Sequence, residues 1–142
     1  MAISKSVRVV IDPNIIGSVL IGGITRQRYI WLIDNLDRFE ICYSEKLIEE
    51  LRHFPEVAYF QKKNITPQII EHFISAFQAS ALKVVVSSKV KIGRDVNDFF
   101  LLSLCRDSRA KFLITGDPDL LEIKQYSLTT IISMKAFVEL FQ

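Results

Sequence analysis

The chain has 142 residues, of which 49% are hydrophobic. This length suits one domain with a core of its own, and this composition excludes an intrinsically disordered chain. The formal net charge of +2 excludes a strongly basic or acidic protein, but it does not decide whether a nucleic acid is a partner.

The sequence lacks the features of a membrane or secreted protein. No segment is both long and apolar enough to cross a bilayer, and the short polar N-terminus does not resemble a signal peptide. Cys42 and Cys105 lie in apolar runs without a CxxC spacing, which predicts buried thiols in a reducing compartment. We therefore expect a soluble, cytoplasmic protein.

The first half of the chain opens with a predicted buried strand. Residues 7–11 are almost wholly apolar and the turn residues Asp12-Pro13-Asn14 stop the run, which is typical of a strand buried on both faces of a parallel sheet. Ser44 is a suitable N-cap for a helix that Pro55 ends. In chain order, this half is predicted to contain a strand at 7–11, helices at 15–22 and 25–36, a strand at 39–43 and a helix at 44–54.

The second half continues the alternation of helices and strands. It is predicted to contain a helix at 66–81, a strand at 84–86, a helix at 95–107, a strand at 111–115, a helix at 118–124, a strand at 128–132 and a helix at 134–141. Such alternation predicts an α/β fold, a three-layer α/β/α domain around a central parallel sheet of about five strands. The carboxyl ends of parallel strands share one edge, and ligands bind there where the strand order reverses.

Two of the predicted strands end in carboxylates. Asp12 directly follows residues 7–11, and Asp117 follows residues 111–115 after one glycine. If both strands are central and parallel, these side chains project from the same edge of the sheet. Each also has a purely structural interpretation, because Asp12 lies in a turn and Asp117 is a good N-cap before a proline.

Two predicted helices contribute further acidic residues. Asp95 and Asp98 are three residues apart at a helix start, so they share a face, although capping and the helix dipole also explain them. On a helical wheel Glu50 lies at the margin of the apolar stripe and Glu49 lies on the opposite side. Glu50 is therefore placed either to reach inward over the sheet edge or to extend along its rim.

A shared location for these carboxylates predicts a metal site. Carboxylates crowded together repel one another unless a cation neutralises them, and the hard ions Mg²⁺ and Mn²⁺ bind oxygen ligands. Such an ion can activate water and stabilise charge on a phosphate. His53 and His72 are isolated in the sequence, which disfavours zinc.

The order and spacing of these segments resemble the PIN-domain family, most closely its bacterial branch of toxin components from type II toxin–antitoxin systems. The segments that carry the likeness are residues 9–14, 44–51, 94–104 and 112–121. The last is the most specific, and the likeness covers nearly the whole chain. It implies one PIN-like domain over residues 1–142 and a Mg²⁺- or Mn²⁺-dependent endoribonuclease, a hydrolase of RNA phosphodiester bonds.

The resemblance also assigns roles to residues. Those that match the family's catalytic, metal-binding acids are Asp12, Glu50, Asp98 and Asp117. Those at accessory positions are Asn14, Asp95, Thr115 and Asp119. One departure is visible, since Pro13 stands where many members have Thr or Ser. Pro13 removes a hydroxyl and a backbone donor beside Asp12.

The partners implied by the resemblance are an RNA substrate, a cognate antitoxin protein over the acidic edge and a second copy of the chain in a homodimer, with no membrane. Lys89, Lys91 and Arg94 lead into the third acidic segment and are candidates for RNA phosphate contacts, although a solvated basic surface explains them as well. Tyr29, Tyr59 and similar aromatics are more simply explained by core packing.

Rival functions stay open. A catalytically silent PIN-like module that acts through protein contacts fits the same fold, and Pro13 favours it. A haloacid-dehalogenase-like phosphatase needs a second aspartate where Asn14 stands, and a phosphate-accepting signalling domain needs an acidic pair after the first strand. The sequence provides neither.

Overall fold

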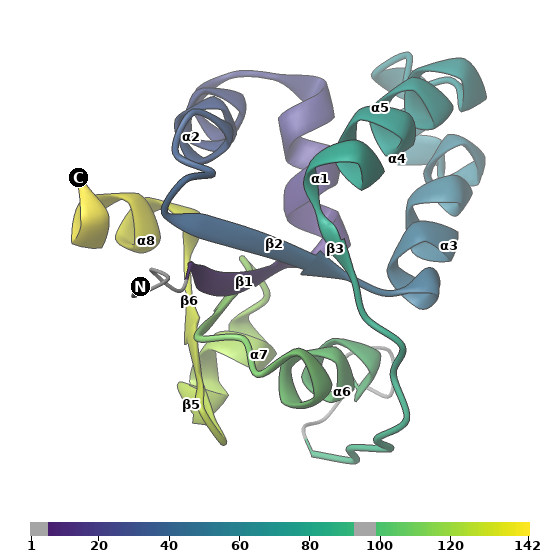
Figure 1. Ribbon diagram of the computed structural model, residues 1–142. Helices are drawn as coiled ribbons and strands as arrows, with labels where there is room; N and C mark the ends of the chain where they lie inside the picture. The colour runs from purple at the N-terminus through teal and green to yellow at the C-terminus, as the bar shows by residue number, and fades with distance from the viewer. Residues whose placement is uncertain (1–5, 93–98) are drawn as a thin grey trace.

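A mostly parallel sheet forms the centre of the protein (Figure 1). The computed structural model describes residues 6–92 and 99–142, and within them six strands pair in the order β3-β2-β1-β4-β6-β5. The strands are β1 (Val7–Ile11), β2 (Phe39–Tyr43), β3 (Leu82–Lys83), β4 (Phe112–Ile114), β5 (Gln125–Tyr126) and β6 (Thr129–Ile132). Every pair is parallel except β5 with β6. The predicted α/β class is confirmed, with six strands where the sequence predicts about five.

Helices lie on both faces of this sheet (Figure 1). One face carries α1 (Pro13–Ile21), α2 (Ile24–Ile33), α3 (Glu45–His53), the 3₁₀ helix η1 (Phe54–Glu56), α4 (Ala58–Lys62) and α5 (Pro67–Ser80). The opposite face carries α6 (Phe99–Ser108) and α7 (Pro118–Ile123), while α8 (Met134–Phe141) packs against α2. The described residues thus form the predicted α/β/α layers.

The strand order reverses between β1 and β4. From β1 the chain adds β2 and then β3 on one side, and it returns to add β4 and β6 on the other side. Val9, Val10 and Ile11 of β1 are completely buried, as are Leu113 and Ile114 of β4, because continuous apolar runs suit strands covered on both faces. The carboxyl ends of β1 and β4 therefore mark the usual ligand position of such a sheet.

The third strand lies two residues earlier than the sequence predicts. Leu82 and Lys83 pair with Cys42 and Tyr43 of β2, so the predicted strand at 84–86 is wrong. Only the N–H of Val84 continues the ladder, donating to the carbonyl of Tyr43 at 2.8 Å. The chain then turns toward α6. Its contact with that helix outweighs the β preference of the valines in this segment.

The remaining differences concern short elements. The strand β5 and the helix α4 are not predicted, because two and five residues carry too little periodicity to detect. The start predicted at Asp95 for the helix at 95–107 lies outside the described residues, within which α6 begins at Phe99. The prediction for α8 is confirmed at both ends.

The helix α1 meets its neighbours at an unusually close distance. Phe54 and Phe60 stack with their ring centroids 4.4 Å apart, and Gly17 lies against them. A Cβ atom at residue 17 would lie 2.7 Å from two ring atoms of Phe60. The missing side chain of Gly17 therefore lets α1 pack onto the aromatic pair.

Both cysteines are buried free thiols, as the sequence predicts. Burial raises the pKa of Cys42 to about 11 and that of Cys105 to about 12. In the part of the chain that the structure describes, no helix has the length and apolar character needed to cross a membrane.

Candidate active site

Asp12 lies at the carboxyl end of β1, and both of its carboxylate oxygens are held by hydrogen bonds. Its Oδ1 accepts the backbone N–H of Asn14 at 2.9 Å, which caps α1. Its Oδ2 accepts the hydroxyl of Thr115 at 2.7 Å. Its own N–H donates to the carbonyl of Ile114 and so joins β1 to β4. Each oxygen keeps a second lone pair with which it can bind a ligand.

Burial dominates the electrostatics of Asp12, which is only 4% exposed. Burial raises the pKa of this carboxyl, the Asn14 N–H and the Thr115 hydroxyl lower it, and the charge of Asp117 raises it again. The net result is a pKa above the ordinary value. The ionised form is thus held in place by hydrogen bonds, and among the residues that the structure describes no positive charge compensates it, a charge that a bound cation would supply.

Thr115 connects Asp12 with Asp117. It directly follows β4 and is completely buried. Its hydroxyl donates to Asp12 and accepts the backbone N–H of Asp117 at 3.1 Å. Asp117 in turn caps α7, since its Oδ1 accepts the N–H of Asp119 at 2.9 Å. One buried hydroxyl therefore sets the relative position of both strand-end aspartates.

Pro13 fits the site without disturbing it. It occupies the first turn of α1, where a backbone N–H has no helical partner, so its missing donor costs nothing. The support that the sequence assigns to Asn14 comes from its backbone N–H. The hydroxyl that Pro13 lacks is provided to Asp12 by Thr115 instead. The hydrogen bonds of Asp12 are therefore compatible with proline at residue 13.

Glu50 has the orientation that helix phase predicts. Its side chain is 38% exposed, compared with 62% for Glu49. Its Oε1 lies 3.3 Å from the ammonium of Lys46 on the same helix, and α3 packs against α1. Glu50 thus lies on the helix beside the one that Asp12 caps, with its carboxylate in a surface ion pair.

The structure brings Asp12 and Asp117 close enough to interact, but it assembles no larger acidic group from the residues it describes. Across residues 6–92 and 99–142, no three Asp, Glu, His or Cys side chains are arranged to hold a metal ion. The predicted site residues Asp95 and Asp98 and the predicted RNA contact Arg94 lie outside those ranges. The four-carboxylate cluster therefore stays a prediction.

The direction of α6 bears on this prediction. The guanidinium of Arg8, near the start of β1, donates to the carbonyl of Ser108 at 3.0 Å, so α6 ends at the amino edge of the sheet. Ten helical residues span about 15 Å. At the other end, Phe100 lines a hollow with Ser44, the residue after β2. Hence α6 begins, at Phe99, near the carboxyl edge that carries Asp12.

Sequence reasoning missed a tether between α6 and the segment after β3. The carboxylate of Asp107 accepts the N–H groups of Ser87 and Ser88 at 2.7 and 2.9 Å and also the Ser88 hydroxyl. Burial acts to raise the pKa of Asp107, but these serine hydrogen bonds and nearby Arg106 leave it lowered. A carboxylate in the last turn of a helix interacts unfavourably with the helix dipole. The position of Asp107 in such a turn was therefore the one indication in the sequence that its side chain has another role.

Lys89 and Lys91, the predicted RNA contacts within the described residues, lie in the segment that is held against α6. The Ser103 hydroxyl accepts the N–H of Val90 at 3.0 Å, which holds the chain between Lys89 and Lys91 against α6. Both lysines are exposed. Their contact with RNA stays a prediction.

A comparison of the sequence with protein families gives one match. Residues 8–119 match the family model of the PIN domain, so the match includes β1, α3, β4 and the start of α7. It covers most of the chain and all the proposed site residues. No curated protein matches the chain.

Proposed function

The chain belongs to the PIN domain family, and on that premise we propose that it is a Mg²⁺- or Mn²⁺-dependent endoribonuclease. PIN domains are in general nucleases, that is, hydrolases that act on nucleic acid, and they typically use divalent metal ions. The dependence of this chain on such a metal, its preference for RNA and the identity of its catalytic residues are the content of the proposal.

The observation that carries the proposal is the pairing of Asp12 and Asp117 through Thr115. The pair lies at the carboxyl ends of β1 and β4, where the strand order reverses. One carboxylate is almost completely buried, and its pKa is raised in part by the other. A buried acid with a raised pKa at such a position is typical of functional sites.

The donor atoms of this pair suit a hard divalent ion. They are carboxylate oxygens, the ligands that Mg²⁺ and Mn²⁺ prefer. Of the nitrogen and sulfur ligands that other metals prefer, His53 pairs with Glu56 on the surface and both thiols are buried. Asp12 and Asp117, with Glu50 and Asp98 as further ligands, would hold the ion. A bound divalent ion would act as a Lewis acid that activates water and neutralises charge on the phosphate.

The chain's own groups then have separate tasks. Thr115 holds the Asp12 carboxylate in one orientation through its hydroxyl. Asp117 or Asp119, which share the first turn of α7, orients the attacking water. Lys46, which contacts Glu50, holds that carboxylate at the rim of the site through a surface ion pair.

The RNA substrate and the biological role are proposed from the likeness of the four segments named above, residues 9–14, 44–51, 94–104 and 112–121, to the bacterial toxin branch of the family. On this basis the chain is the toxin of a type II toxin–antitoxin pair, acts in the cytoplasm and forms a homodimer. A cognate antitoxin protein would cover the edge that carries Asp12 and so block access to the pair.

The direct test is cleavage of a fluorogenic single-stranded RNA by purified protein with Mn²⁺. We expect Asp12→Asn to lower the rate by at least about 100-fold, because even indirect disturbance of metal ligands costs 10–100-fold. We expect chelation of the metal to abolish cleavage in the wild type.

The matched control is Asp37→Asn, which makes the same chemical change at an exposed turn position between α2 and β2. It should cleave at the wild-type rate. Cleavage by Asp12→Asn at the rate of the wild type would show that the activity, if present, belongs to another site or to a contaminating nuclease.

A further inference from the structure

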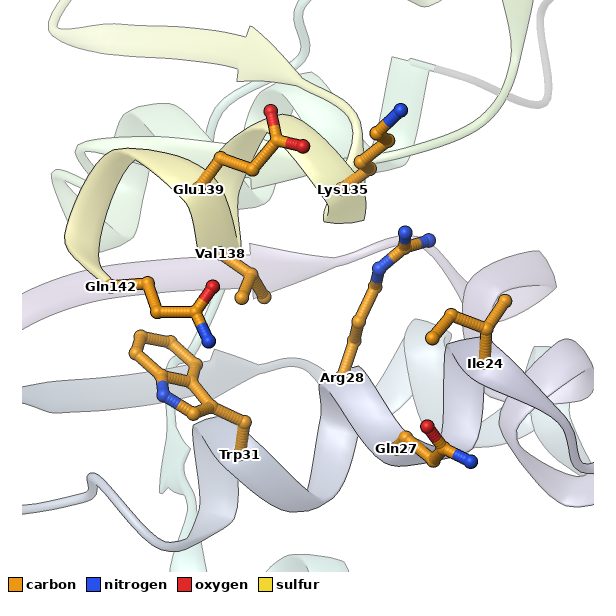
Figure 2. A pocket seen from close by; sticks show the side chains of 8 residues that line it. All are labelled: Ile24, Gln27, Arg28, Trp31, Lys135, Val138, Glu139 and Gln142. Carbon is orange, nitrogen blue, oxygen red and sulfur yellow. The ribbon is translucent and has the colours of Figure 1, made fainter.

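A pocket of about 410 Å³ lies between α2 and α8 (Figure 2). Arg28 and Trp31 line it from α2, and Lys135 and Val138 line it from α8. Its walls therefore come from two helices that are far apart in the sequence. None of these residues belongs to the acidic site described above.

Two cations in this pocket, Arg28 and Lys135, form no ion pair with any residue that the structure describes. Figure 2 shows Arg28 and Lys135 extending from the two facing helices toward the same end of the pocket. Within the described parts of the chain, neither side chain forms an ion pair or a hydrogen bond. Glu139 also lines the pocket but is joined to neither of them. An anion bound at this end of the pocket would be attracted by both cations.

The other end of the pocket has a fixed aromatic wall. The Trp31 ring packs against Phe39 and Phe137, with centroids 5.9 and 6.5 Å apart. The guanidinium of Arg38 lies 6.0 Å from the Trp31 ring centroid. These contacts hold the indole in place beside the amide of Gln142, whereas Gln27 lies at the end of the pocket that carries Ile24 and Arg28 (Figure 2). Cations next to a flat ring and amide groups suit a nucleotide, which carries a phosphate and a base.

The basic end of the pocket is close to the candidate active site. The carbonyl of Ile132, the last residue of β6, accepts the N–H of Thr115 at 3.0 Å. Lys135 follows three residues later, a distance of at most about 11 Å along the chain. Since Thr115 also holds Asp12, the pocket opens near the edge of the sheet that carries the acidic pair.

We propose that the pocket between α2 and α8 binds the backbone of a single-stranded nucleic acid, with Arg28 and Lys135 on one phosphate. This proposal rests on the proposed function, because it takes the anion to be part of the RNA substrate. Arginine contacts phosphate through two parallel N–H groups and lysine adds a point charge, so the pair provides strong, sequence-independent binding. The pocket thereby anchors the strand that crosses the acidic edge.

The test measures RNA binding separately from cleavage. The probe is a fluorescein-labelled single-stranded RNA of about 12 nucleotides, and fluorescence anisotropy is recorded over a range of KCl concentrations with full-length protein carrying Asp12→Asn. Adding Arg28→Gln and Lys135→Gln together should weaken binding by about ten-fold or more. The slope of log affinity against log salt should fall by about 0.7, because the two cations neutralise one phosphate of a single strand.

The matched control replaces Lys62 and Lys63, exposed residues at the end of α4, with glutamine. It removes the same charge from the surface of the protein, so it should change the slope little. An equal loss of RNA affinity in both variants would show that the effect comes from net charge alone, and this would overturn the proposal. Unchanged binding by the Arg28→Gln/Lys135→Gln variant would overturn it too and leave an acidic protein as the occupant of the pocket.

Kinetics of the catalytically intact protein separate this proposal from the proposed function. The pocket variant should raise KM for the RNA and leave kcat unchanged, since it lacks only binding contacts. An unchanged KM would contradict the proposal that the pocket binds RNA, but it would not contradict the proposed nuclease activity. RNA binding that depends on the pocket, without cleavage that depends on Asp12, would contradict the proposed nuclease activity and still support RNA binding by the pocket. Thermal melting of each variant confirms that it is folded.

Discussion

At the scale of single residues, Thr115 has the largest influence on the candidate site. Its buried hydroxyl is donor to Asp12 and acceptor for the N–H of Asp117. The family resemblance marks Thr115 as an accessory residue, but local sequence does not indicate that its hydroxyl joins the two aspartates, because a threonine at a strand end also fits an ordinary β-branched residue. The two aspartates can be predicted from their strand-end positions, whereas the group that joins them depends on a contact between residues 103 positions apart.

Replacing Thr115 by valine keeps the shape of the side chain and removes the hydroxyl. We expect the cleavage rate to fall by about 10–100-fold and the Mn²⁺ requirement to rise, because Asp12 loses its orientation. We expect the free energy of unfolding to fall by about 1–3 kcal/mol, since the N–H of Asp117 loses its acceptor. Cleavage kinetics at varied Mn²⁺ and urea denaturation measure the two effects.

The control for this change is Thr130→Val, at an exposed position on β6. It should alter stability by no more than about 0.5 kcal/mol and leave cleavage unchanged. If Thr115→Val needed no more Mn²⁺ than the wild type, Thr115 would be a structural residue only.

The thiols give a prediction for alkaline pH. Burial raises the pKa of Cys42 and Cys105 from 9.0 to about 11 and about 12, so the unfolded thiols ionise first. Their contribution to stability is fully present below pH 9.0 and is lost as pH rises toward these values. We expect a thiol-specific reagent to label neither cysteine in the native protein at mildly alkaline pH and both in urea. Fast labelling of the native protein would contradict their burial.

At the scale of elements, long segments with clear periodicity are predicted well. The sequence places α8 correctly because Ser133 caps a run of apolar residues at helical spacing. It places the strand after Ser80 wrongly because Val84, Val85 and Val86 have a higher β preference than Leu82 and Lys83. The pairing with β2 and the tether to Asp107 decide that register, and neither is visible in local sequence.

The close contact of α1 with its neighbours can be tested at Gly17. Alanine favours a helix over glycine by about 1 kcal/mol, but its Cβ would lie 2.7 Å from the Phe60 ring. Since the ring is stacked on Phe54, we expect Gly17→Ala to lower the free energy of unfolding by about 1–3 kcal/mol. Urea denaturation measures the change.

The neighbouring substitution Ser18→Ala serves as the control, because Ser18 lies in the same helix and its hydroxyl bonds only to the carbonyl of Asn14. It should leave stability unchanged or slightly higher. A Gly17→Ala variant as stable as Ser18→Ala would show that the aromatic pair moves freely.

At the scale of the whole molecule, the order of strands explains why the site lies where it does. The chain starts in the middle of the sheet, so β1 and β4 are neighbours although about 100 residues separate them, as their pairing shows. Strand ends indicate Asp12 and Asp117, and Thr115 joins these two in the structure, whereas the place of Glu50 in the site, which helical phase indicates, stays a prediction. The pocket formed by α2 and α8 cannot be predicted from the sequence, because its cations come from opposite ends of the chain.

The most direct test of the proposed metal site is a crystal structure of the protein soaked in Mn²⁺, with anomalous scattering to locate the ion. We expect a peak in contact with the carboxylates of Asp12 and Asp117, with Glu50 turned away from Lys46 toward it and Asp98 completing the group. An empty acidic edge at a saturating Mn²⁺ concentration, with these side chains well separated, would contradict the site.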